Sequence, residues 1–282
     1  MKTQWENFLQ NLGEWHGSFT GISSKAEILQ DTPSILILES LDDQNKQVRL
    51  TLRRFYSFAK TPESQVNEIV IDYQTTDKNI LYFENGAFSR GIIRIVPFSK
   101  CVAEFCLINK NRRLRLVPLF NQDGNFDKLT LIREKRAGTD AAENPPLTVD
   151  ALLGKWQGEG ITMYPDLGRT DTYPTQMKLN IDNTGRLVQE ITFGNKNPQI
   201  ITSSAKIEGS ILHFEKSPRP AKVFLLPDGG SATLPVKIEF RKPLYFEIGW
   251  LVEPQLRQRI IRSYNDKGEW VSSTLVTEQK IE

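Results

Sequence analysis

Pairs of arginines at alternate positions lie near the end of each half of the chain. Arg257 and Arg259 lie in RQRIIRSY, and Arg113 and Arg115 lie in RRLRLVPLF. Alternate residues of a strand share one face, so each pair would present two guanidinium groups side by side. A guanidinium binds a carboxylate through two parallel hydrogen bonds. The chemistry that these residues predict is binding of a carboxylated ligand.

The neighbours of the second arginine pair extend this candidate site. Trp250 lies in LYFEIGWLV on the preceding predicted strand, where its indole could stack on a ligand. The sequence Arg262-Ser263-Tyr264 resembles the Arg-x-Tyr pair with which fatty-acid-binding barrels hold a carboxylate. We therefore predict one ligand-binding site in the second half of the chain, formed by Trp250, Arg257, Arg259, Arg262 and Tyr264.

The direction in which the arginines point depends on the register of this hairpin. Arg257 and Arg259 share one strand face, and Arg262 lies on the other. If Trp250 lies beside Gln258, its face includes Arg262, whereas a one-residue shift places it beside Arg259. In the first half, leucines alternate with the arginines, which favours arginines on the outer face of the folded domain as solvated or interface charges. The alternative is an anion site in the interior of the domain.

The sequence contains no residue set that by itself predicts catalysis. With only two histidines, His16 and His213, the sequence disfavours a histidine-based metal site and a pair of Ser-His-Asp triads. Neither a Gly-x-Ser-x-Gly motif nor a phosphate loop occurs. Cys101 and Cys106 would lie on opposite faces of one strand, which disfavours a disulfide, and are interpreted as small apolar residues. We predict no metal or cofactor and leave enzymatic activity open.

Short strands must position these residues. PTQMKLNID and PVKIEF alternate apolar and polar residues, and turn signals such as Asn85-Gly86 and Asp123-Gly124 separate such runs. This pattern predicts antiparallel hairpins. The exception is the N-terminus, where the apolar residues have helical spacing behind Thr3, with Glu6 placed to complete a capping box.

The chain repeats itself. LGEWHGSF, from Leu12, shares its frame with LGKWQGEG, from Leu153, and NQDGNFDKLTLIREK aligns with NDKGEWVSSTLVTEQK near the two ends. Between the copies, AGTDAAENPPL is small, polar and proline-paired, as linkers are. We predict a first domain at residues 1–136, a linker at 137–147 and a second domain at 148–282.

Each predicted domain has enough short strands for an antiparallel up-and-down barrel, which removes exposed strand edges. Gly13-Glu14-Trp15 and Gly154-Lys155-Trp156 resemble the Gly-x-Trp signature that opens lipocalins after a short helical turn. The resemblance implies an all-β chain of two tandem lipocalin-like barrels, each preceded by a short helix. The tryptophans are interpreted as structural plugs.

A second resemblance is narrower. Trp250, Pro254, Arg257 and Arg259 are similar in order to the penultimate hairpin of lipocalin-like phycobilin lyases. The first half has Cys106 at the place interpreted as equivalent to the tryptophan. The whole chain resembles a two-domain lipocalin-like family of unknown function from cyanobacteria and plastids, related to those lyases. This resemblance implies a bilin as one candidate ligand and a phycobiliprotein as one candidate partner.

Composition sets limits on function. A net charge of +2 gives no field that favours nucleic acid, and we find neither a signal core nor an apolar run that spans a bilayer, so we expect a cytoplasmic protein.

We predict binding of a small hydrophobic carboxylated molecule, such as a bilin or a fatty acid, in a barrel cavity, with lyase or chaperone activity as an extension. The alternative is a non-catalytic interaction protein with filled barrels that acts through its surface.

Overall fold

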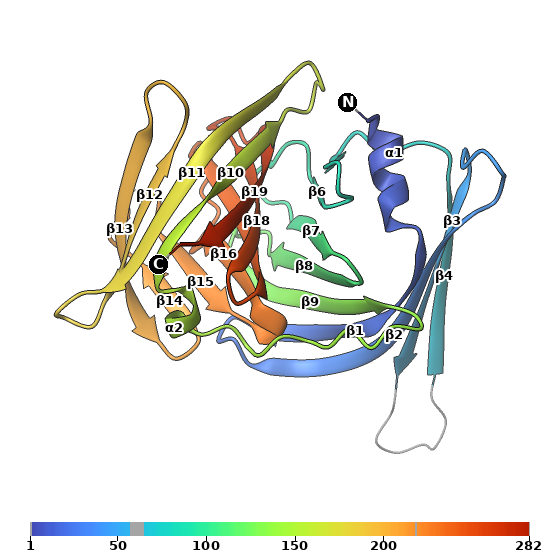
Figure 1. Ribbon diagram of the computed structural model, residues 1–282, viewed down its shortest axis with the longest axis horizontal. Helices are drawn as coiled ribbons and strands as arrows, with labels where there is room; N and C mark the ends of the chain where they lie inside the picture. The colour runs from blue at the N-terminus through green and yellow to red at the C-terminus, as the bar shows by residue number, and fades with distance from the viewer. Residues whose placement is uncertain (1, 57–64, 218, 282) are drawn as a thin grey trace.

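The structure is a computed structural model that describes residues 2–56, 65–217 and 219–281, and it contains two antiparallel sheets (Figure 1). The first sheet contains β1 (Gly13–Ser23), β2 (Ile28–Ser40), β3 (Val48–Tyr56), β4 (Gln65–Tyr73), β5 (Ile80–Tyr82), β6 (Phe88–Gly91), β7 (Cys101–Asn109), β8 (Arg112–Phe120) and β9 (Phe126–Arg136). It curls into a half-barrel whose two edges are β4 and β5.

The second sheet closes completely. It contains β10 (Gly154–Met163), β11 (Thr170–Ile181), β12 (Leu187–Phe193), β13 (Gln199–Glu208), β14 (Ile211–Phe214), β15 (Ala221–Leu225), β16 (Gly230–Pro235), β17 (Leu244–Glu253), β18 (Leu256–Tyr264) and β19 (Trp270–Lys280). Its strands pair in chain order, and β19 returns to pair with β10. Short helices precede both sheets, namely α1 (Gln4–Phe8) with η1 (Leu9–Asn11), and α2 (Val149–Leu152). The prediction of two tandem up-and-down barrels with short preceding helices is confirmed, with the first copy left open.

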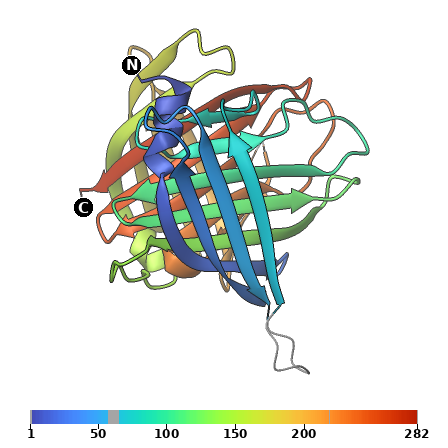
Figure 2. The same ribbon diagram turned by 90° about the vertical axis from the view of Figure 1, so that its right-hand side faces the viewer.

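Helix α1 covers the edge strand β5. Thr3 and Glu6 form the predicted capping box. The Gln4 side chain donates to the carbonyl of Tyr82 at 3.0 Å and accepts from its N–H at 2.7 Å, as a neighbouring strand would. The Phe8 ring contacts the rings of Tyr82 on β5 and Tyr73 on β4. The helix therefore lies across the seam that strand pairing leaves unclosed (Figures 1 and 2).

The repeated Leu-Gly-x-Trp-x-Gly motif has the same structural task in both copies. Trp15 is fully buried and donates its indole N–H to the Asn11 carbonyl at 3.0 Å, and Trp156 does the same to Leu152 at 2.8 Å. At the motif's last glycine a Cβ would lie 1.9 Å (Gly17) or 2.0 Å (Gly158) from a backbone oxygen of the neighbouring strand. Only glycine allows this close approach of β1 to β9 and of β10 to β19.

The two sheets share one hydrophobic core. Aromatic contacts run from Phe126 and Phe120 of the first sheet to Phe224 and Phe246 of the closed barrel, with ring centroids 5.2–5.5 Å apart. Asn144, in the segment between the sheets, donates to the Asp228 carboxylate at 2.6 Å. The two copies are therefore joined by packing as well as by the chain. Among the described helices, none has the length and apolar character needed to cross a membrane.

Candidate functional site

The interior of the first sheet contains a buried network of arginine and glutamate side chains. Arg113 Nε donates to Glu134 Oε2 at 2.8 Å. Arg115 donates to both oxygens of the same carboxylate at 3.0 Å and to Glu104 Oε1 at 2.9 Å. The Arg113 guanidinium also lies 4.4 Å from the centroid of the Trp15 ring. Although burial raises the pKa of Glu134, Arg113 and Arg115 outweigh it and hold that pKa at about 2.

The closed barrel repeats this network. Arg259 donates to both oxygens of Glu278 at 3.1 Å and to Glu247 Oε2 at 3.1 Å. Arg257 Nη1 lies 3.5 Å from Glu278 Oε1. Although burial lowers the pKa of Arg259, the two carboxylates outweigh it and raise that pKa above its ordinary value. All three guanidinium nitrogens of Arg259 therefore donate hydrogen bonds to protein carboxylates.

These networks correct the interpretation that the alternate arginines point outward. Both pairs face the interior of their sheet and are buried. Two guanidinium groups meet two carboxylates in each copy, so the charges balance without a ligand. Burying an ion costs several kcal/mol, and close carboxylates repay that cost. The arginine pairs are thus mainly structural cations.

The five predicted site residues do not lie in one place. Trp250 pairs with Gln258 across the hairpin, so Trp250, Arg262 and Tyr264 lie on the face opposite to Arg257 and Arg259. Arg262 and Tyr264 pack against the first sheet: Arg262 donates to the carbonyls of Ser89, Gly91 and Ile92 at 3.2–3.3 Å, and the Tyr264 hydroxyl donates to the Ile92 carbonyl at 2.9 Å. The Trp250 indole donates to the Asp228 carbonyl at 2.8 Å. Arg262 and Tyr264 therefore form part of the contact between the sheets, whereas the hydrogen bond of Trp250 lies within the second copy.

The register also corrects one proposed equivalence. Cys106 pairs with Arg115, and Gly249 pairs with Arg259, so Cys106 corresponds to Gly249. Leu107 therefore stands where the second copy has Trp250. Cys101 and Cys106 are buried, free thiols on opposite faces of β7, and burial raises the pKa of each to about 12.

The interior of the closed barrel contains a cavity of about 500 Å³. One part of its wall is polar: the Thr162 hydroxyl lies 3.0 Å from the Tyr173 hydroxyl and 2.7 Å from that of Thr274. The buried hydroxyl of Thr175, also in this wall, has no hydrogen-bond partner among the described residues. Exposed Arg219 lies at its rim. The apolar part of the wall contains Ile191, Phe193, Ile201, Phe214, Val223, Ile261 and Val276.

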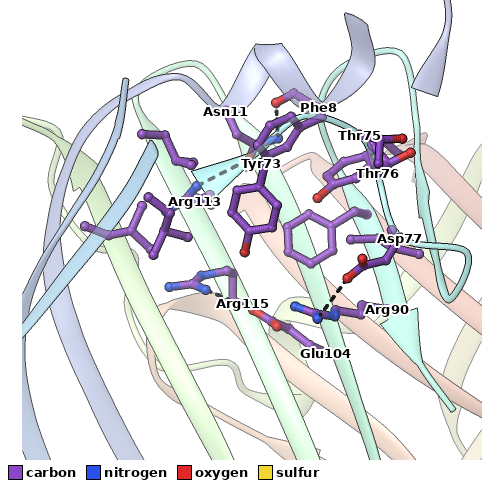
Figure 3. A pocket seen from close by; sticks show the side chains of 16 residues that line it. Phe8, Asn11, Tyr73, Thr75, Thr76, Asp77, Arg90, Glu104, Arg113 and Arg115 are labelled. Atoms are coloured by element: carbon purple, nitrogen blue, oxygen red, sulfur yellow. Dashed lines mark hydrogen bonds and ion pairs between the residues drawn. The ribbon is translucent and has the colours of Figure 1, made fainter. Parts of the chain in front are cut away.

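A smaller pocket of about 100 Å³ lies under α1 in the first sheet (Figure 3). Tyr73 and Arg115 point into it, and the Arg90 guanidinium lies 3.2 Å from the Asp77 carboxylate at its side. Arg113 Nη2, which belongs to the same wall, is buried without a hydrogen-bond partner in the described part of the chain. The volume of this pocket suits a few water molecules or a small anion, whereas the cavity of the closed barrel is within the size range of ligand sites.

Sequence reasoning missed the carboxylates and hydroxyls that define these interiors. Glu134 and Glu278 occupy equivalent places in the aligned ends LIREK and LVTEQ, and Glu104 on β7 and Glu247 on β17 also occupy equivalent places. The repeated glutamates were a visible signal, because a carboxylate retained in both copies opposite an arginine predicts an ion pair. Thr175 gave no such signal. Within the residues that the structure describes, no group of three His, Cys, Asp or Glu side chains could hold a metal ion.

Comparisons with known proteins give the following matches. The N-terminal model of the domain of unknown function DUF3598 matches residues 1–139, and the model described as "Biogenesis factor required for ATP synthase 1, C-terminal domain" matches residues 143–281. A crystal structure of a DUF3598 protein of unknown function from Nostoc punctiforme is 48% identical, with a TM-score of 0.91 and 100% of both chains covered. An S-type phycobiliprotein lyase from Guillardia theta is 12% identical over 48% of this chain and 90% of its own, with a TM-score of 0.37. No curated protein sequence matches.

Proposed function

The chain belongs to the DUF3598 family, and we propose that it is a binding protein whose closed barrel holds a small amphipathic carboxylate. The observation that carries this proposal is the cavity of about 500 Å³ with one apolar wall and one wall of hydroxyl groups. Ligand sites of roughly 300–1,000 Å³ bury most of a small molecule, and a few placed polar groups fix its orientation. The cavity has both properties.

The hydroxyl groups of the polar wall determine which chemical group the inner end of the ligand carries. Thr162 hydrogen-bonds to Tyr173 and to Thr274, whereas the Thr175 hydroxyl is buried and has no partner among the residues that the structure describes. A buried hydroxyl without a partner carries a desolvation cost, which a carbonyl or hydroxyl of a ligand would remove. We therefore expect the inner end of the ligand to carry a neutral hydrogen-bonding group next to Thr175.

The carboxylate belongs at the other end of the ligand. Arg259 lies in the cavity wall, but Glu278 and Glu247 already engage its donors. Arg219 is exposed at the rim, where it can meet a carboxylate without removing that carboxylate from water. This assignment moves the anion contact from the predicted Arg257 and Arg259 to Arg219. Bilins and long-chain carboxylates that carry a second polar group fit this description.

The test is a binding panel with matched variants. An open-chain tetrapyrrole and hydroxylated and plain long-chain fatty acids are titrated against the parent chain, with tryptophan fluorescence and calorimetry as readouts. Thr175→Val should weaken binding about 2- to 10-fold, and Arg219→Gln about 2- to 5-fold, as one neutral hydrogen bond and one exposed ion pair imply. Thr202→Val, on the outer face of β13, and Arg53→Gln, on β3, are the controls. The proposal fails if no panel member binds, or if all four variants bind like the parent.

A second candidate function follows from the family match over residues 143–281. That model describes a biogenesis factor required for ATP synthase, so an assembly factor that acts through its surface is the alternative. It predicts direct binding to purified ATP synthase subunits, measured by co-elution on gel filtration. Thr175→Val would leave that binding unchanged, because the cavity is not on the surface. Ligand binding that responds to Thr175→Val, without binding to any subunit, would favour the first proposal.

A further inference from the structure

Two loops in equivalent positions of the two copies carry exposed apolar side chains. The loop at residues 92–100 precedes β7, and the loop at 236–243 precedes β17. Phe98 is 85% exposed and Phe240 is 55% exposed, which are high values for phenylalanine. We call the following five exposed residues the twin-loop surface: Ile93, Val96, Phe98, Val236 and Phe240.

The two loops lie together and are anchored. Each one pairs with a turn of the other copy: the Ile95 N–H donates to the Gly268 carbonyl, and the Ile238 N–H donates to the Gly124 carbonyl, both at 2.8 Å. Val96, Phe98 and Phe240 line one groove of about 490 Å³ between the loops. These hydrogen bonds anchor the backbone of each loop, and Phe98 and Phe240 are exposed at the tips.

Basic residues surround these apolar side chains. The first loop carries Arg94 and Lys100 without an acidic residue. The second loop carries Lys237, Arg241 and Lys242 against one acidic residue, Glu239, which pairs with Lys242 at 2.5 Å. The adjoining turns at 121–125 and 265–269 add three acidic residues, Asp123, Asp266 and Glu269, and one basic residue, Lys267, so the loops and turns together carry six basic and four acidic residues. The surface as a whole therefore combines apolar tips with an excess of positive charge.

We infer that the twin-loop surface docks the protein on an anionic membrane surface. Aromatic and aliphatic tips that enter the boundary between headgroups and acyl chains bury apolar area, while neighbouring lysines and arginines meet lipid phosphates. The excess of positive charge distinguishes this surface from one that recognises a neutral apolar segment. The attachment is peripheral and reversible, and it does not depend on occupancy of the cavity in the closed barrel.

The experiment measures binding to lipid vesicles by sedimentation. Parent protein is mixed with phosphatidylcholine vesicles that contain about 30% phosphatidylglycerol or none, at low and at physiological salt. We expect binding to the anionic vesicles, weakened by salt. Phe98→Ser with Phe240→Ser should reduce the partition coefficient at least about 10-fold, and Lys237→Gln with Arg241→Gln should reduce it roughly 5-fold or more.

The control variant is Ile28→Ser with Leu29→Ser, because these residues are also exposed, at 61% and 60%, on a hairpin of the first sheet. It should bind vesicles like the parent, and circular dichroism should show that all variants are folded. The inference is overturned if the parent does not sediment with anionic vesicles, or if the Phe98 and Phe240 variant binds as the parent does. If the Phe98 and Phe240 variant no longer binds a purified protein partner but still binds vesicles as the parent does, the surface recognises a protein. This result would also overturn the inference.

Discussion

Replacing Glu134 by glutamine should destabilise the protein strongly, because one carboxylate neutralises two buried guanidinium groups. Glu134 accepts from Arg113 and Arg115 at 2.8–3.0 Å, and its side chain has no exposed surface. Its pKa is lowered from an ordinary value of 4.5 to about 2. At about 1.4 kcal/mol for each pKa unit, the ionised carboxylate contributes about 3.5 kcal/mol.

The sign of the pH dependence follows from the direction of this shift. The pKa of Glu134 in the folded chain lies below its value in the unfolded chain, so its contribution is complete above about pH 4.5. It is lost as the pH falls from 4.5 through about 2. Glu134→Gln removes this contribution and leaves Arg113 and Arg115 short of an anion. Breaking a buried pair in this way costs about 3–5 kcal/mol.

The assay is urea unfolding followed by tryptophan fluorescence at pH 7 and at about pH 3.5. Glu104→Gln is the matched control, since the Glu104 side chain is 24% exposed and, in the described part of the chain, forms an ion pair only with Arg115. We expect it to cost roughly 1 kcal/mol or less. At about pH 3.5 the Glu134→Gln penalty should be smaller by roughly 1.4 kcal/mol but should not vanish, because this pH lies about one unit below the ordinary pKa and still above the pKa of about 2 in the folded chain. A penalty below about 1 kcal/mol at pH 7, or one equal to that of Glu104→Gln, would refute the reasoning.

Three further predictions follow from the fold. Gly158→Ala should cost at least about 2 kcal/mol, because its Cβ would lie 2.0 Å from a backbone oxygen, whereas Gly168→Ala, with its nearest atom at 3.6 Å, should change the unfolding midpoint little. At pH 8 neither Cys101 nor Cys106 should react with a thiol reagent until urea unfolds the chain, since burial raises the pKa of each thiol to about 12; reaction of the native protein would contradict this. Limited proteolysis within residues 138–142 should give two fragments that remain together on gel filtration, because the sheets share a core; separate elution would argue against that core.

The part of the fold that was predictable from sequence rests on local patterns. Alternation of apolar and polar residues predicted the strands, and the repeated LGxWxG frame predicted two similar sheets. The Thr3 and Glu6 capping box was readable because its two residues are three positions apart. The opposite faces of Cys101 and Cys106 followed from the parity of their spacing. Each of these features depends on neighbours in the chain, so no knowledge of distant contacts was needed.

The open seam of the first sheet was not readable in this way. The sequence gives both copies a similar series of strands, but in the structure β4 and β5 do not pair, and Gln4 of α1 provides hydrogen bonds to β5 instead. That outcome depends on where α1, which lies more than 70 residues before β5 in the chain, packs in the folded protein. The cavity of the closed barrel is equally non-local, because its volume is what remains after side chains from many strands have filled the interior.

The sequence by itself determined that the arginines occur in alternating pairs, and therefore that Arg257 and Arg259 share a face while Arg262 lies on the other. Only the tertiary structure decided which face is inside. A shift of one residue in the register of β17 and β18 exchanges the two faces, and local alternation is the same in either register. The pairing of β18 with both of its neighbours, β17 and β19, fixed the choice, because it brought Glu247 and Glu278 to the arginines and offset the free-energy cost of burying them, as Glu104 and Glu134 do in the open first sheet.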